Sequence, residues 1–107
     1  MNRSTVNVQS SDGVIRAVSA EEERGLAVHK GIGSNSNLWT ISHVGTGLRI
    51  AHFRIRSLAQ GCMIELAYST DWYQITDTDK NNETLKPIIV PIVKRWQAIE
   101  KATRGVK

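Results

Sequence analysis

Two short runs of alternating apolar and polar residues constrain the fold of this chain more than any other feature. The runs cover residues 38–44 and 47–53, and a glycine-threonine pair separates them. Glycine at the first of two loop positions, here Gly45, is typical of a type II′ turn. The pattern therefore predicts a β-hairpin in which Val44 pairs with Gly47.

In that register the hairpin has one apolar and one polar face, because side chains alternate between the two faces of a sheet. The apolar face carries Trp39, Ile41, Leu48 and Ile50, together with His43 and His52. The polar face carries Thr40, Ser42, Arg49 and Ala51. We therefore expect a sheet that buries one face and exposes the other to solvent.

The segment before the hairpin extends the sheet. Residues 25–32 read as a strand, and the polar loop at 33–37 would join this strand to the hairpin as an antiparallel neighbour. Residues 1–24 form either a mobile arm or a peripheral hairpin that turns at Ser10–Gly13. Within this arm, Ser19–Glu22 has the pattern of a capping box and predicts a short helical turn.

The segment after the hairpin predicts a helix. Ser57 and Gln60 have the spacing of a second capping box, so we expect the helix to run from there to about Thr70. Its apolar face, at helical spacing, comprises Ala59, Cys62, Met63, Leu66 and Ala67. A glycine inside a helix costs up to about 1 kcal/mol, and we expect Gly61 to be tolerated because it lets the helix lie close to a strand.

A second helix is predicted at the end of the chain. Its apolar stripe comprises Leu85, Ile88, Ile89, Ile92, Trp96 and Ile99. Proline is favoured at the first helical position and disfavoured inside a helix, so we expect the helix to begin at Pro91 and residues 88–90 to be extended. The alternative is a longer helix that kinks at this proline. Residues 77–83 read as a polar loop.

These segments together predict the α+β class, with a three-stranded antiparallel meander packed against one helix and a second helix at the C-terminal end. The chain has 107 residues, which is typical of one domain. We therefore expect residues 25–107 to form a single α+β domain, preceded by the arm at 1–24. At least two of the three tryptophans, Trp39, Trp72 and Trp96, should lie in its core.

Composition limits the classes of protein to which the chain can belong. No apolar run approaches the ~18 residues of a membrane span, and the N-terminal residues lack the apolar stretch of a signal peptide. The single cysteine, Cys62, excludes an internal disulfide and a cysteine-based zinc site. We expect a reduced cytoplasmic protein without membrane association or cofactor.

Basic residues suggest an anionic partner. The formal net charge is +4, and Arg49, Arg54 and Arg56 lie on and just after the last predicted strand. We predict a non-enzymatic protein that binds nucleic acid through the polar sheet face. The three arginines would contact phosphates, with Thr40 and Ser42 as secondary donors. The competing interpretation is that these charges only keep the protein in solution.

The histidines and the cysteine carry no recognisable catalytic or metal-binding pattern. His29, His43 and His52 are spaced unlike metal ligands, and no carboxylate stands beside them in a useful pattern. We expect histidines at the edge of the core that bond to the backbone. Cys62 lies in the apolar stripe of the first helix, where a thiol is inert. An enzyme would have to pair His43 or His52 with a distant carboxylate.

An aromatic pair supports a different function. Trp72 and Tyr73 follow Asp71 at the end of the first helix and could form a contact surface for a partner protein. They could equally close the small core. The alternative function is thus an adaptor or inhibitor that docks onto another protein. Val93 widens the apolar stripe of the last helix, which would suit a homodimer through that helix.

Overall fold

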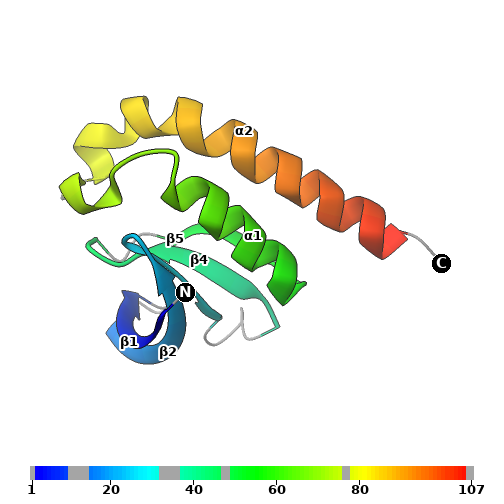
Figure 1. Ribbon diagram of the computed structural model, residues 1–107, viewed down its shortest axis with the longest axis horizontal. Helices are drawn as coiled ribbons and strands as arrows, with labels where there is room; N and C mark the ends of the chain where they lie inside the picture. Colours follow the sequence, from blue (N-terminus) through cyan, green and yellow to red (C-terminus); the bar gives the residue numbers. More distant parts are fainter. Residues whose placement is uncertain (1, 10–14, 32–36, 47–48, 76–77, 106–107) are drawn as a thin grey trace.

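Five consecutive strands pair in chain order, β1-β2-β3-β4-β5, into one antiparallel sheet, and two helices cover one of its faces (Figure 1). The computed structural model describes residues 2–9, 15–31, 37–46, 49–75 and 78–105. The strands are β1 (Asn2–Gln9), β2 (Ile15–Glu23), β3 (Leu26–Lys30), β4 (Trp39–His43) and β5 (Arg49–Phe53). The helices are α1 (Arg56–Ala67), the short 3₁₀ turn η2 (Trp72–Gln74) and α2 (Thr78–Gly105).

The predicted α+β class is confirmed, but the predicted number of strands is wrong. The three predicted strands correspond to β3, β4 and β5, and the arm at 1–24 contributes two more. The capping box at Ser19–Glu22 was also a wrong prediction, because this segment belongs to β2. Arg24 and Gly25 have φ values of 51° and 92°, and this pair joins Glu23 to its partner Leu26. Positive φ at both loop positions is the geometry of a type I′ hairpin turn.

The β1–β2 ribbon curls beneath β4 and β5, on the side away from the helices (Figure 1). A small second core forms there from buried Val6, Ala20 and Ala27, with Val18 and Val44 partly buried against it. The prediction of one solvent-exposed sheet face was therefore wrong. The strand pair at the start of the chain covers that face.

The pairing of β4 with β5 follows the predicted register at Ser42, which lies opposite Arg49, and is shifted by one residue from Ile41 to Trp39. Ile41 lies opposite Ala51, and an irregularity follows between Ile41 and Ser42. Ala51 therefore lies on the buried apolar face, and His52 lies on the opposite face, beside Thr40. The predicted type II′ turn was also wrong, because Gly45 does not have the positive φ that this turn requires. The predicted positions of Gly47 and Leu48 lie outside the described residues.

The main core lies between the sheet and α1. All five predicted apolar positions of α1 are buried, and Leu26, Ile41 and Phe53 face them from the sheet. Of the tryptophans, Trp72 is fully buried, whereas Trp39 and Trp96 are partly buried against this core.

The backbone just before α1 is bonded by a residue from α2. The helix begins at Arg56, and Ser57 lies inside it, so the predicted capping box at Ser57 is absent. The carboxylate of Glu100 instead accepts hydrogen bonds from the backbone N–H groups of Arg54, at 2.9 and 3.1 Å, and Ile55, at 3.1 Å. Arg54 and Ile55 directly precede the first residue of α1, so this carboxylate ties the start of the helix to α2.

The last helix is longer than predicted. α2 contains both Pro87 and Pro91, so the predictions of a start at Pro91, an extended segment at 88–90 and a polar loop over 78–83 were wrong. The two prolines are one turn apart and both are exposed. A solvent-facing side is where a helix tolerates tilted carbonyl groups best. Within the described residues, neither long helix has an apolar stretch that could cross a membrane.

Gly61 forms the closest approach between α1 and α2. A Cβ atom at this position would lie 2.5 Å from Cη2 of Trp96. The expectation that Gly61 permits a close contact therefore holds, but its neighbour is α2 and not a strand. Val93, predicted to widen an outward stripe of α2, is buried in the core.

Candidate functional site

The structure separates the five residues predicted to contact nucleic acid into three groups. Thr40 and Ser42 are each 1% exposed, so they do not lie on a solvent-facing surface. Arg49 is exposed at the first residue of β5, whereas Arg54 and Arg56 are exposed beyond its last residue. The length of β5, four steps of ~3.3 Å or roughly 13 Å, lies between these positions.

Arg54 and Arg56 belong to a cluster of cations that we call the basic end. It comprises Lys30, Arg54, Arg56 and Lys101, and Trp39 contacts Lys30 and Arg56. The residues come together because β3 ends, β4 begins, β5 ends and α1 begins at the same edge of the molecule.

Trp39 holds two of these cations in place. The guanidinium carbon of Arg56 lies 5.1 Å from the centre of the indole ring, and Nζ of Lys30 lies 5.8 Å from it. These distances are within the range of cation–π attraction. Lys30 lies opposite Trp39 in the adjacent strand. This pairing could have placed Lys30 in the predicted site, but the sequence prediction did not use it.

Glu100 brings the last turns of α2 to the basic end. Its carboxylate bonds the backbone of Arg54, and Lys101 follows it directly on the helix. The negative charge of Glu100 is 9% exposed and faces those N–H groups, whereas the side chain of Lys101 is exposed. The exposed side chain of Lys101 therefore adds a positive charge to the surface here, while the Glu100 carboxylate faces inward.

One carboxylate on β2 offsets part of this charge. Glu21 forms an ion pair with Arg56 and lies 3.9 Å from the guanidinium of Arg3. Among the described residues, Lys30, Arg54 and Lys101 have no ion-pair partner. These three charges are available to an anion.

The face of the sheet that the β1–β2 ribbon covers holds two hydrogen-bonded pairs. Nδ1 of His29 lies 2.9 Å from the carbonyl oxygen of Lys30, so this nitrogen donates, and Nε2 accepts from the Ser42 hydroxyl at 2.8 Å. The hydroxyl of Thr40 and Nδ1 of His52 form the second pair, at 3.0 Å. Burial, and then the charge of Arg49, lower the pKa of His52. Burial also lowers the pKa of His29, against its backbone bond to Lys30, and both rings favour the neutral form.

The Ser42–His29 pair has the orientation of a nucleophile and its general base, but its surroundings are closed. Ser42 is 1% and His29 3% exposed, so the hydroxyl is out of reach of a substrate in this structure. The pair acts structurally, since it satisfies polar groups that the β1–β2 ribbon covers.

Trp72 and Tyr73, predicted as a partner-binding pair, have different environments. Trp72 is 1% exposed, and its indole N–H donates to the carbonyl oxygen of Leu66 at 2.7 Å. It closes the core, as the competing interpretation held. Tyr73 is 67% exposed and remains a candidate contact residue.

The two other residues singled out from the sequence are buried. Both ring nitrogens of His43 are bonded, Nε2 to the Trp72 carbonyl oxygen at 2.7 Å and Nδ1 to the Thr46 hydroxyl at 2.8 Å. It is thus a core-edge histidine bonded to the backbone, as expected. Burial is the main factor that raises the pKa of the Cys62 thiol to about 12, so the thiol is not a nucleophile at neutral pH.

Comparison with known proteins adds no functional assignment. No protein-family model matches the chain, and no curated protein or solved structure is significantly similar to it. Within the described part of the chain, no three His, Cys, Asp or Glu side chains are grouped so that they could hold a metal ion.

Proposed function

We propose that this chain is a non-enzymatic binding protein that binds nucleic acid at the basic end. The observation that carries the proposal is that Lys30, Arg54, Arg56 and Lys101, from separate elements, lie at one edge of the fold, where Trp39 contacts Lys30 and Arg56. Lysine and arginine side chains bind phosphate groups and supply most of the affinity of such proteins.

The proposed surface differs from the sheet face that the sequence suggested. Thr40 and Ser42 are left out because they are buried, and Arg49 is left out because it lies at the other end of β5. Arg54 and Arg56 are kept. The amino end of α1 is left out as well, because the carboxylate of Glu100 lies against the N–H groups of Arg54 and Ile55, just before the helix, and its negative charge repels a phosphate there.

Salt dependence provides the first test. Fluorescence anisotropy would follow the binding of labelled single- and double-stranded DNA and RNA at several salt concentrations. If all four cations contact phosphates, the logarithm of the affinity should fall with the logarithm of salt with a slope of about −3. Absence of binding even at low salt would overturn the proposal.

A pair of double variants with equal charge separates the basic end from diffuse charge. Lys30→Ala with Arg54→Ala should weaken binding and make the slope shallower by about 1.5. Arg49→Ala with Lys86→Ala removes the same charge from exposed positions elsewhere and should change the slope little. Equal losses in both double variants would show that the basic end has no special role.

A further inference from the structure

We propose that a pocket at the opposite end of β3 and β4 binds a lysine or arginine side chain presented by a partner protein. The pocket has a volume of about 240 Å³ and lies between the β2–β3 turn, the β4–β5 turn and η2. Its walls include Glu22, Val44, Tyr73 and Ile75. This site is independent of the basic end, since the length of β3 separates the two.

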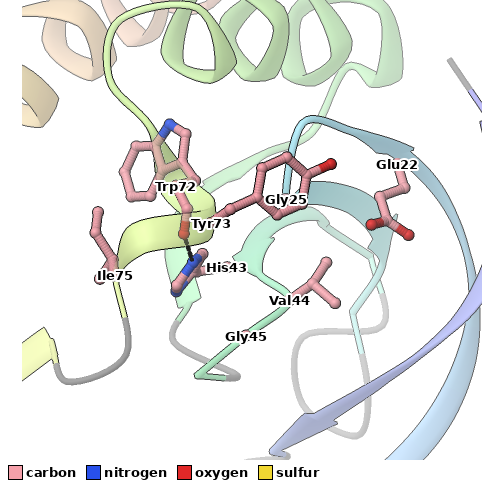
Figure 2. A pocket seen from close by; sticks show the side chains of 8 residues that line it. All are labelled: Glu22, Gly25, His43, Val44, Gly45, Trp72, Tyr73 and Ile75. Atoms are coloured by element: carbon pink, nitrogen blue, oxygen red, sulfur yellow. Dashed lines mark hydrogen bonds between the residues drawn. The ribbon is translucent and has the colours of Figure 1, made fainter.

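The walls suit the two parts of a long basic side chain. In Figure 2, Tyr73 extends from η2 across Gly25, and Val44 lies on the β4–β5 side of the same space. These groups, with Ile75, would contact the aliphatic part of the ligand side chain. The carboxylate of Glu22 would bind its charged end.

Glu22 is held in position but retains a free oxygen. The Ser4 hydroxyl donates to its Oε2 at 2.9 Å, while Oε1 has no partner among the described residues. The nearest histidine, His43, is engaged through both ring nitrogens and does not compete for this carboxylate. A carboxylate fixed in this way at the edge of an apolar pocket is complementary to a cation and not to an anion.

Two further carboxylates lie close to the pocket in the chain, on Glu23 and Asp71. Of the cations at this end, Arg24 is placed over the ring of Tyr68 at 4.7 Å, and Arg49 lies in β5, opposite Ser42. Glu22 is the charged residue that lines the pocket itself.

Exposed aromatic residues identify the source of the ligand side chain as a protein. Tyr73 is 67% and Tyr68 63% exposed, and Arg24 stacks on Tyr68. Tyrosine and arginine are the residues most often found at the energetic centre of protein interfaces. A pocket for one side chain beside such a surface fits a peptide segment of a partner better than a free small amine.

Nuclear magnetic resonance of the full ¹⁵N-labelled chain would test the proposal. The probes are pentapeptides with blocked ends, four glycines around a central arginine, lysine or norleucine. We expect saturable shifts of the Gly25, Gly45 and Tyr73 amides with arginine or lysine, and at least tenfold weaker binding with norleucine, which keeps the stem but lacks the charge. Absence of shifts with the basic peptides, or equal binding of norleucine, would overturn the proposal.

Matched variants assign the charge to one carboxylate. Glu22→Gln should weaken binding of the basic peptides at least tenfold, and it keeps an acceptor for Ser4. Glu23→Gln removes the same charge from the next residue, on the other face of β2, and should leave binding within twofold. Equal losses in both variants would replace the pocket with a diffuse acidic surface. Free lysine amide serves as a competitor. If it bound as tightly as the peptides, the ligand would be a small amine and not a side chain of a partner protein.

Discussion

The turn between β2 and β3 requires a residue that tolerates positive φ. Gly25 has a φ of 92°, and a Cβ atom there would lie 3.2 Å from Cβ of Trp72. We expect Gly25→Ala to lower the free energy of unfolding by about 1–2 kcal/mol, because it combines backbone strain with crowding of Trp72. Urea denaturation would measure this change. The control is Gly45→Ala, where φ is not positive and the nearest atom is 3.4 Å away; a loss as large as that of Gly25→Ala would contradict the explanation.

Gly61 presents two opposing effects at one residue. Alanine is favoured over glycine in a helix by roughly 1 kcal/mol, but overpacking costs typically 1–3 kcal/mol. The added methyl group would meet the ring of Trp96, whose N–H is tied to Glu65 at 3.1 Å, so the ring cannot move freely. We therefore expect Gly61→Ala to destabilise the protein.

The same substitution should change sign when the crowding is removed. In a Trp96→Leu background, Gly61→Ala should raise the free energy of unfolding by up to about 1 kcal/mol, because only helix propensity remains. Thermal and urea unfolding of the four proteins in this double-mutant cycle would measure the coupling. Additive effects would show that Gly61 and Trp96 do not interact.

At the scale of elements, the contact of α2 with the start of α1 depends on Glu100. Glu100→Ala leaves two backbone N–H groups without their acceptor and should cost about 1–3 kcal/mol of unfolding free energy. Glu100→Gln keeps one carbonyl oxygen and should cost less. Lys101→Ala, at the next, exposed position, is the control and should stay within about 0.5 kcal/mol of the parent. Equal stability of all variants in urea denaturation would contradict the capping role.

How far the sequence predicts each element depends on how local its signal is. Alternation located β4 and β5, and the helical spacing of Cys62 and Leu66 located α1, because both patterns are carried by the segment itself. The hairpin of β1 and β2 was one of two alternatives, because Ser19–Glu22 imitates a helix start, and the pairing of β2 with β3 was missed because Arg24-Gly25 is not a typical hairpin pair. The cap of α1 was missed because its acceptor is distant in the chain. A helix that continues through Pro91 was only the alternative, because proline preference is local, whereas packing on α1 is not.

The candidate sites also combine residues that are close in the chain with residues that only the fold brings together. Arg54 and Arg56 were found from their closeness in the chain, whereas Lys30 and Lys101 join them only through strand pairing and Glu100. Thr40 and Ser42 were placed on an exposed surface because alternation gives the two faces of a sheet but not what covers each face.

At the scale of the whole molecule, His29 and His52 make stability depend on pH. The pKa values of His29 and His52 are lowered from 6.5 in the folded protein, so the unfolded chain binds more protons below that pH. Stability should therefore be constant above about pH 7 and fall as the pH decreases below 6.5. Urea denaturation at pH 7.5 and 5.5 would measure the loss, in a range where most carboxylates stay ionised.

The double variant His29→Gln with His52→Gln identifies the source of this dependence. It should unfold with nearly the same free energy at both pH values, because the two groups that take up protons on unfolding are gone. A loss between pH 7.5 and 5.5 that persists in the variant would assign the effect to other groups.

The distant cap on α1 also bears on how the chain folds during its synthesis. Each strand of the sheet pairs with its neighbour in the chain, so the sheet can grow as the chain emerges. The carboxylate of Glu100 lies 46 positions after Arg54, whose N–H it accepts. A nascent chain that stops before Glu100 would hold paired strands while the N–H groups of Arg54 and Ile55 still lack this acceptor. During synthesis the five strands are therefore complete before Glu100, which ties the start of α1 to α2, is added to the chain.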